Sequence, residues 1–428
     1  MLESKEAQQI ANHTIFTGDN LDIMRGMDSE TIDLIYLDPP FNSNRHYQAP
    51  IGSKAAGAEF KDAWTLEDIK EAWWGLIADE HPALYKVIDA AGGVGNRGDK
   101  AYLIYMAMRL LEMRRLLKPT GSIYLHCDPT MSHSLKMVMD AIFGHKNFRN
   151  EIVWHYSGRE KKHRQHFSRK HDVVMFYSAS EKSTFNSFSI PWAEEEFLKH
   201  RHDVVKVDGK LVIKSDAADG TRYFRDASEV MKKGKPISDV WKLNVINSSA
   251  KERTGYPTQK PLALLKRIIL ASSNEGDMVL DPFCGCATAC IAAESLGRQW
   301  IGIDISPKAA ELVQIRAERE LTDFFSSQSG IFEINHRTDI PVRKENVARS
   351  KNIKHLLFGK QEGKCNGCGH IFPFQNFTVD HIVPTAKGGP DSDKNLQLLC
   401  GHCNSVKSDD DMPTLMARLK AKKIGAKV

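Results

Sequence analysis

The residues Asp38-Pro39-Pro40-Phe41 place a carboxylate, two rigid backbone carbonyls and an aromatic ring in four consecutive positions. They follow the apolar run 32–37, whose length and β-branched content predict a buried strand. The two prolines end that strand and fix its backbone. Because ligands in open α/β sheets bind at the carboxyl ends of strands, we expect this segment to hold a flat base by its exocyclic amine. Asp38 and the Pro39 carbonyl would each accept an N–H, and Phe41 would stack on the ring.

A second group that could do chemistry lies near the C-terminus, where two CxxC pairs occur in sequence. The four residues are Cys365, Cys368, Cys400 and Cys403. In a reducing compartment such pairs indicate metal rather than disulfides, and this spacing is typical of structural zinc sites.

The elements that would position Asp38 alternate between strands and helices. A strand at 14–17 ends at Gly18-Asp19-Asn20 and is followed by a short helix and by the strand that leads to Asp38. Further elements are predicted as a helix at 101–117, a strand at 122–127, a helix at 131–143, a helix at 262–272, a strand at 278–283, a helix at 288–296 and a strand at 299–304. This alternation predicts a doubly wound α/β sheet. Asp19 would face the same cleft as Asp38, cap the following helix, or do both.

The unit from 278 to 304 has the pattern of a nucleotide-type site. Asp304 lies 19 positions after Gly285, the separation at which an acidic residue meets ribose hydroxyls. The run from Gly285 to Cys290 has only the first glycine of GxGxxG, so the phosphate-binding signature is incomplete. S-adenosylmethionine has a ribose, an adenine and a carboxylate but no phosphate. One close-approach glycine and a helix N-terminus suffice for it.

The segments 42–98 and 150–260 do not show this alternation of strands and helices. We expect 42–98 to have irregular structure. Two roles stay open for its aromatic residues, namely a mobile flap over the cleft and extra packing in the core. Strands at 151–156 and 172–177 flank a run rich in Lys, Arg and His, which favours phosphate contact over a solvated loop. The predicted DNA-binding residues are Arg159, Lys161, Lys162, Arg164, Arg169 and Lys170.

Length and charge place limits on the organisation. A chain of 428 residues predicts two or three domains, and 326–350 has the composition of a linker. Segment 150–260 has 21 basic and 15 acidic residues, and 351–428 has 12 and 7, whereas the whole chain carries only +5. Two basic segments beside an acidic body indicate two regions that touch nucleic acid. We expect no membrane span, no signal peptide and a cytoplasmic location.

The run from Asp281 to Thr288 resembles the AdoMet-binding loop of the amino-methylating DNA methyltransferases, and 254–261 resembles the segment before it. Gly18-Asp19-Asn20 and 118–122 also match, and the order of the motifs is that of the β class. The resemblance implies an AdoMet-dependent methyltransferase at 1–325, with a target-recognition insertion at about 150–255 and double-stranded DNA as partner. It implies that the catalytic residues are Asp38, Pro39, Pro40 and Phe41, and that the cofactor-binding residues are Asp19, Thr258, Lys260, Asp281, Phe283, Gly285 and Asp304.

Within this family, Asp38 in place of serine favours adenine N6 over cytosine N4. The target base would leave the duplex to reach the site. The chain departs from the family at Ala287, where glycine is usual, and this would weaken but not abolish AdoMet binding. Four further cysteines are expected to be small packing residues near the cofactor. They are Cys127, Cys284, Cys286 and Cys290.

The segment from Lys364 to about Ser408 is similar to the HNH endonucleases, through Asp380-His381, Asn395 and the two CxxC pairs. The resemblance implies a small zinc-stapled ββα-metal domain at 351–428, in which zinc is structural. His381 would be the general base, oriented by Asn395, and Asp380 and Asn404 would hold Mg²⁺. Asn404 stands where many members have histidine, so the preference for a particular metal stays open.

Together these patterns predict a fused DNA methyltransferase and HNH nuclease that serves restriction–modification. An orphan methyltransferase whose zinc module only binds DNA is the main alternative, and an RNA-modifying enzyme is another. A homodimer and a separate restriction or specificity subunit both stay open.

Overall fold

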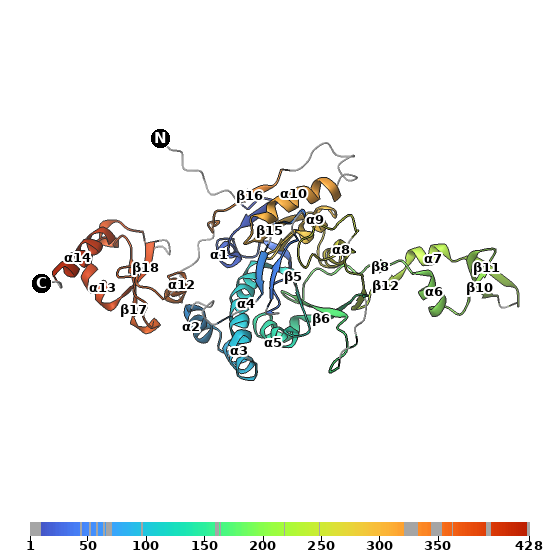
Figure 1. The fold of residues 1–428 in the computed structure, drawn as a ribbon, viewed down its shortest axis with the longest axis horizontal. Helices are drawn as coiled ribbons and strands as arrows, with labels where there is room; N and C mark the ends of the chain where they lie inside the picture. The colour runs from blue at the N-terminus through green and yellow to red at the C-terminus, as the bar shows by residue number, and fades with distance from the viewer. Residues whose placement is uncertain are drawn as a thin grey trace.

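The computed structural model contains one large sheet covered by helices, a protruding insertion and a small C-terminal unit (Figure 1). It describes residues 10–42, 45–50, 53–56, 59–62, 65, 71–95, 97–158, 162, 164–217, 219–247, 249–320, 333–343, 353–361, 363–390 and 395–425. None of the helices formed by these residues has both the length and the apolar character needed to cross a membrane.

The central sheet, within the described residues, has nine strands in the order β13-β6-β7-β5-β2-β14-β15-β1-β16. Their bounds are β1 Thr14–Thr17, β2 Ile32–Leu37, β5 Leu117–Cys127, β6 Phe148–His155, β7 His171–Ser178, β13 Val240–Lys242, β14 Met278–Asp281, β15 Gln299–Asp304 and β16 Asn335–Arg337. Strand β7 is antiparallel to both of its neighbours, and all other neighbouring pairs are parallel. The carboxyl ends of β1, β2, β14 and β15 therefore meet at one edge.

Helices cover both faces of this sheet, as the alternating pattern predicted. One face packs against α1 Asn20–Arg25, α2 Glu71–Glu80, α3 Pro82–Val94, α4 Arg97–Leu116 and α5 Ser132–Phe143. The other packs against α8 Leu262–Ser272, α9 Thr288–Glu294 and α10 Lys308–Glu320. Strand β2 is buried throughout, and its side chains alternate between the two cores: Ile35 joins the first and Leu34 the second. The predicted doubly wound fold is confirmed.

The segment 42–98 is more regular than expected. It contains a hairpin of β3 Arg45–Gln48 and β4 Glu59–Asp62, followed by α2 and α3. Pro82 starts α3, where a missing N–H costs no helical hydrogen bond. Trp73 is only 4% exposed and belongs to the main core, so core packing is the correct alternative for this residue. Trp64 lies outside the described residues.

The predicted insertion at 150–255 is wrong at both ends, because β6, β7 and β13 are strands of the central sheet. The protruding part is made of β8 Ser189–Ile190, α6 Glu194–His200, β9 Val204–Val207, β10 Lys210–Asp216, β11 Arg222–Asp226, α7 Ser228–Lys233 and β12 Lys235–Pro236. Its small core contains Phe197, Val204 and Ile213. Figure 1 shows it extending from the β6 side of the sheet, on the side away from the C-terminal unit.

The C-terminal unit contains α12 Ile353–Lys360, β17 Phe377–His381, β18 Leu396–Cys400, α13 Gly401–Lys407 and α14 Met412–Gly425. Its own core includes Phe358, Phe377, Leu398 and Leu415. The predicted linker at 326–350 needs correction, because β16 pairs with β1 at the edge of the central sheet. Three residues are too short a strand to produce a readable hydrophobic period.

Candidate functional site

One cavity of about 610 Å³ lies where the four parallel strands end. Asp19 follows β1, Asp38 follows β2, and Asp281 and Asp304 are the last residues of β14 and β15. The cavity is within the size range of small-molecule sites. All residues predicted for cofactor binding and methyl transfer line it, namely Asp19, Asp38, Pro39, Pro40, Phe41, Thr258, Lys260, Asp281, Phe283, Gly285 and Asp304. Their individual roles stay predictions.

The Asp38 carboxylate is held from one side only. Its Oδ2 atom accepts a hydrogen bond of 2.5 Å from Lys260 Nζ, and the two side chains are 16% and 9% exposed. Its Oδ1 atom is buried and has no hydrogen-bond partner in the described structure. The Lys260 ammonium also lies 5.3 Å from the centre of the Phe41 ring. Since an unpaired buried acceptor is costly, Oδ1 is poised to accept a donor from a ligand.

A buried histidine that the sequence analysis missed lies beside this carboxylate. His126 is 0% exposed, and its Nδ1 is 4.0 Å from Asp38 Oδ1. Its Nε2 lies 3.1 Å from Asp172 Oδ2, and its ring stacks on Phe41 at 5.8 Å between centroids. The position of His126 at the end of β5, the strand next to β2, was the signal available in the sequence.

In the turn after β14, the backbone of Gly285 lies close to the ring of Tyr256. Gly285 has φ +51°, and a Cβ there would lie 2.8 Å from the Tyr256 ring. Its N–H donates to Asp304 Oδ2 at 2.8 Å, and the Ser306 N–H donates to the other oxygen. Burial raises the pKa of Asp304. Asp304 therefore fixes the loop that lines the cavity, and the predicted ribose contact would use its remaining lone pairs.

The backbone of Ala287 has a strained conformation. It has φ 55° and ψ 40°, in the left-handed region, and it precedes α9 as the N-cap residue. An L-residue in this conformation costs about 1–2 kcal/mol. The family's preference for glycine at this position thus has a backbone reason in this chain.

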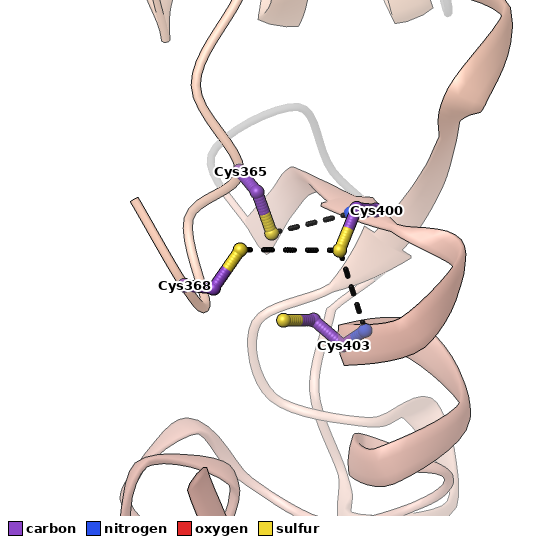
Figure 2. Close-up of side chains that lie close together, drawn as sticks. All are labelled: Cys365, Cys368, Cys400 and Cys403. Carbon is purple, nitrogen blue, oxygen red and sulfur yellow. Dashed lines mark hydrogen bonds between the residues drawn. The ribbon is translucent and has the colours of Figure 1, made fainter. Parts of the chain in front are cut away.

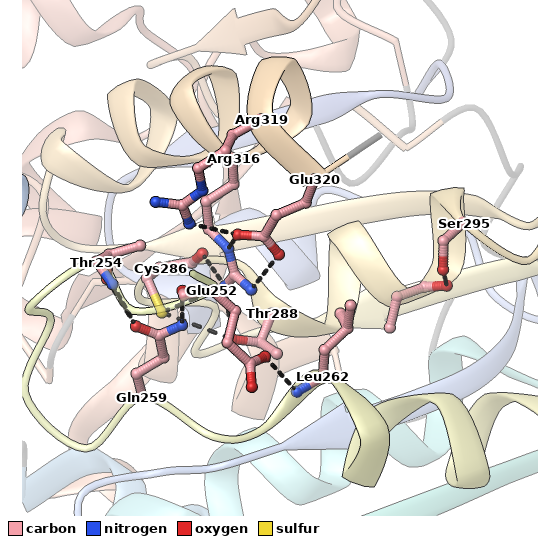
Figure 3. A network of polar contacts seen from close by, with 11 residues as sticks. Glu252, Thr254, Gln259, Leu262, Cys286, Thr288, Ser295, Arg316, Arg319 and Glu320 are labelled. Atoms are coloured by element: carbon pink, nitrogen blue, oxygen red, sulfur yellow. Dashed lines mark hydrogen bonds and ion pairs between the residues drawn. The ribbon is translucent and has the colours of Figure 1, made fainter. Parts of the chain in front are cut away.

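A buried polar network connects the loops on either side of the cavity (Figure 3). Arg316 donates to the Cys286 carbonyl at 3.0 Å and to Thr288 Oγ1 at 2.7 Å, and it pairs with Glu320. Gln259 accepts from Thr254 N and Oγ1 and donates to the Glu252 carbonyl. These bonds hold the loop that carries Lys260 and the turn that precedes α9.

Two further carboxylates of the cavity, Asp19 and Asp281, also have structural partners. Asp19 accepts from the Leu21 N–H and pairs at 2.8 Å with Arg109, which is 2% exposed, so it caps α1 and faces the cavity. Asp281 accepts from the Phe283 N–H, and burial raises its pKa well above the ordinary value, although that bond opposes the rise. Both of the roles considered for Asp19 are therefore compatible with its position.

The predicted DNA-binding residues that the structure describes do not line this cavity. Lys162, Arg164 and Arg169 are exposed, whereas Lys170 is half-buried and donates to the Gly158 carbonyl. Arg169 lies 3.8 Å from Asp128, which follows β5. Arg159 and Lys161 are outside the described residues. Contact with DNA stays a prediction for this loop.

The four CxxC cysteines converge as predicted (Figure 2). Their sulfur atoms all lie within 4.8 Å of one another, and the Cys368 and Cys400 sulfurs are 4.0 Å apart. Tetrahedral zinc, with Zn–S bonds of about 2.3 Å, holds thiolates about 3.8 Å apart, so the donor set fits zinc. Burial opposes ionisation of Cys365, but backbone N–H groups directed at its sulfur lower its pKa, which favours the metal-binding thiolate.

The residues of the predicted nuclease site lie on the ββα arrangement of β17, β18 and α13. Asp380 Oδ2 lies 3.1 Å from the ammonium of Lys407, whose side chain is 1% exposed, and accepts from Gln397 at 2.9 Å. Lys407 also donates to the His381 carbonyl. Asp380 and the half-buried Asn404 offer the oxygen donors that Mg²⁺ prefers. Mg²⁺ at this carboxylate would therefore have to displace the Lys407 ammonium.

Asn395, predicted to orient His381, lies against the loop that follows this histidine, and its role stays a prediction. Its side chain bonds to the Val383 N–H and carbonyl and to the Pro390 carbonyl, at 2.8–2.9 Å, rather than to the His381 ring. It therefore fixes the loop that follows His381 and acts on that residue only through the backbone. The amide can satisfy these groups because it offers both donors and an acceptor.

The four other cysteines behave as packing residues. All are buried, and burial raises their pKa values, so they stay neutral thiols. Cys284 and Cys290 lie close to Gly302, where an added Cβ would meet their sulfurs at about 3 Å.

Comparison with known proteins assigns both parts of the chain. The family model described as DNA methylase matches residues 32–315, and the model described as HNH endonuclease matches 365–410. The chain is 28% identical over 330 residues to the type II methyltransferase M.HpaI of Haemophilus parainfluenzae, covering 77% of this chain and 82% of that protein. It is 28% identical over 294 residues to the DNA adenine methyltransferase YhdJ of Escherichia coli, covering 68% and 78%.

Among solved structures, the chain is similar to the cytosine-N4-specific PvuII DNA methyltransferase, with 15% identity, a TM-score of 0.45, and coverage of 76% of this chain and 95% of that one. The methylase match spans β2, β14 and β15 of the cavity but not β1, and the HNH match spans the four cysteines. The chain belongs to the DNA methylase family of N6 and N4 methyltransferases and carries an HNH endonuclease domain after it.

Proposed function

We propose that this protein transfers a methyl group from S-adenosylmethionine to N6 of adenine in double-stranded DNA. The observation that carries the proposal is the buried Asp38 Oδ1 atom, which has no partner in the described structure and lies at the cavity beside Phe41. An amino group is the donor that such a carboxylate oxygen would accept. Asp38 rather than serine favours adenine, and the relative YhdJ is named an adenine methyltransferase.

The cavity fits the methyl donor in size and in chemistry. Gly285, at which a side chain would strike Tyr256, allows close approach of the ligand to the backbone, and Asp304 offers lone pairs to ribose hydroxyls. The N-terminus of α9 would face the donor's carboxylate. S-adenosylmethionine would supply an electrophilic methyl group on its sulfonium.

The residues of the cavity would then hold the amine for attack. The target base would leave the duplex and stack on Phe41. Asp38 Oδ1 and the Pro39 carbonyl would accept its two N–H groups and direct the nitrogen lone pair towards the methyl group. Lys260 fixes the other oxygen of Asp38, so the geometry is set before the substrate arrives.

We further propose that zinc occupies the four-cysteine cluster and that the HNH domain cuts DNA with His381 as general base, as part of restriction–modification. The rival proposal is a zinc-stapled domain that only binds DNA. A specific observation favours that rival: the Asp380 carboxylate, expected to hold Mg²⁺, is already paired with the buried Lys407. The exposed basic loop around Arg164 and the protruding part at 189–236 are proposed to contact DNA.

The experiment that tests these proposals uses the full chain and two preparations of one plasmid. One is unmodified, and the other is first incubated with the protein and S-adenosylmethionine without added divalent cation and then purified. Both are incubated with fresh protein and Mg²⁺. Nucleosides are analysed by mass spectrometry for N6-methyladenine and N4-methylcytosine, and Asp38→Ala and His381→Ala serve as controls for the two activities. A structured RNA added as competitor tests the class of nucleic acid.

The expected result is N6-methyladenine in the second preparation, with cutting of the unmodified DNA only. N4-methylcytosine alone would overturn the adenine assignment, and methylation of RNA in preference to DNA would overturn the substrate. Cutting of the methylated DNA only would replace restriction–modification by modification-dependent cleavage. Methyl transfer without cutting of either preparation would leave the rival role for the HNH domain.

A further inference from the structure

The His126–Asp172 pair forms a buried chain of hydrogen bonds that leads to the Asp38 carboxylate. Tyr36 OH lies 3.0 Å from His126 Nδ1, and Asp172 Oδ2 lies 3.1 Å from Nε2. The Tyr156 hydroxyl donates to the other oxygen of Asp172 at 3.2 Å. Strands β2, β5 and β7 bring these groups together, because β5 lies between the other two in the sheet.

The partners of His126 fix its tautomer. Burial acts to raise the pKa of Asp172, but the hydrogen bond with His126, the charge of Lys260 and the hydrogen bond from Tyr156 lower that pKa, so Asp172 is a carboxylate at neutral pH. A carboxylate only accepts, so Nε2 carries the proton. Burial raises the pKa of Tyr36, which keeps its hydroxyl a donor. Nδ1 is therefore the basic nitrogen, and it faces Asp38.

The two atoms that face each other have complementary roles. Asp38 Oδ1 is the buried oxygen with no hydrogen-bond partner in the described structure, and His126 Nδ1 lies 4.0 Å from it. When Nδ1 gains a proton, it becomes a donor that this oxygen can accept. The resulting imidazolium would be flanked by the carboxylates of Asp38 and Asp172, which stabilise it. A base oriented by a carboxylate is the arrangement used in other buried catalytic pairs.

We propose that His126, oriented by Asp172, receives through Asp38 the proton that leaves the exocyclic amine during methyl transfer. The N–CH₃ bond forms from the nitrogen lone pair, and the S–CH₃ bond breaks with its electrons left on sulfur. The nitrogen then carries a positive charge and loses one proton to Asp38 Oδ1, which passes it to His126 Nδ1; the imidazolium later releases it to solvent. The inference rests on the amino-methylating activity and applies to adenine N6 and cytosine N4 alike.

His126 thus acts through Asp38 and is a positioning and proton-accepting residue. The charged and titratable groups that face it are Asp38 and Tyr36 from the β2 side, Asp172 and Tyr156 from the β7 and β6 side, and Lys260 from the loop before α8. Protonated His126 cannot accept a further proton. The rate of methyl transfer should therefore fall in acid.

The test is the pH dependence of single-turnover methyl transfer to DNA by the full chain. Wild-type protein, His126→Gln, Asp172→Asn and Tyr177→Phe are compared. Tyr177 is a matched control because it is a buried residue of β7 whose hydroxyl bonds to Asp140, on the far side from the cavity. Binding of S-adenosylmethionine is measured by calorimetry for each variant. Nitrogen NMR of the imidazole rings, without any ligand, reports the tautomer of His126.

We expect His126→Gln and Asp172→Asn to lose about 100-fold in rate, within the range of general-base effects, with unchanged binding of the methyl donor. The acidic limb of the rate profile should disappear in His126→Gln, and the Nε2–H tautomer should be lost in Asp172→Asn. If His126→Gln does not fold, the inference is tested with the near-isosteric Asp172→Asn, through its rate of methyl transfer and the tautomer of its His126. An unchanged acidic limb, or a wild-type Nδ1–H tautomer, would overturn the inference. Wild-type protein without methyl transfer to any DNA would instead refute the proposed function.

Discussion

Replacement of Asp38 by alanine tests the central assignment of the cavity. The substitution removes the buried oxygen that would accept the amine and the partner of Lys260. A hydrogen bond to a charged group is worth about 1.5–3 kcal/mol, and loss of one transition-state contact in a preorganised site costs about 3–4 kcal/mol. At about 1.4 kcal/mol per tenfold change in rate, we expect methyl transfer to fall by about 10²- to 10³-fold.

The assay follows transfer of a labelled methyl group to DNA in a single turnover, alongside the affinity for S-adenosylmethionine. That affinity should change little, because Asp304, Gly285 and α9 are untouched. Asp33→Ala is the matched control: Asp33 lies on the same strand, pairs with Lys118 at 2.7 Å, and sits at the end of β2 away from the cavity. Transfer by Asp38→Ala within tenfold of wild type, or an equal loss in Asp33→Ala, would refute the reasoning.

Four further substitutions test the supporting structure. Ala287→Gly should raise the free energy of unfolding by up to about 1 kcal/mol in urea titrations, because glycine relieves the left-handed strain; a decrease would contradict this. Cys403→Ser should lower the zinc content and the melting temperature of the C-terminal unit but leave methyl transfer within about twofold, since the methylase match ends before it. Lys407→Met should destabilise that unit by about 3 kcal/mol, because it leaves Asp380 without its cation, and added Mg²⁺ should raise the melting temperature of the variant more than that of the wild type. Asp172→Asn should make the free energy of unfolding depend less on pH in acid. The pKa of Asp172 in the folded protein lies below the ordinary 3.8, so the stability that its carboxylate contributes is present above that pH and is lost as the pH falls through the folded pKa. Identical acid-unfolding curves for the variant and the wild type would argue against this.

Much of the methylase unit could be predicted from local patterns. The strand 299–304 and the helix 262–272 match the structure residue for residue, and the strand that ends at Asp38 was recognised from its apolar run and its prolines. Parallel strands present their carboxyl ends at one edge, so the assembly of the acidic residues there followed from the βα alternation alone. The cysteine cluster could also be predicted from local sequence, because the turn within each CxxC pair places two ligands side by side.

Contacts between distant segments were beyond this reasoning. Asn395 was expected to orient His381, but the sequence did not show that its amide would bind the backbone of the loop at 382–390. The Lys407 ammonium on Asp380 joins a helix to a strand 27 positions away, and no periodicity marks it. A short edge strand such as β16 is likewise determined by its neighbour β1 rather than by its own three residues.

The order of the strands explains why the chemistry of the cavity is shared between both halves of the methylase unit. Strand β2 lies between β5 and β14, so Asp38 meets His126 from one side and the Lys260 loop from the other. One oxygen is thereby fixed by a cation, and the other is left facing a base and the ligand. Asp281 and Asp304 add two further acidic side chains to the same cavity, and a ligand with a positive charge on sulfur would favour their ionised forms. The ratio of the affinities for the methyl donor and for its neutral product, measured in the wild-type protein, would show how much this charge contributes to binding.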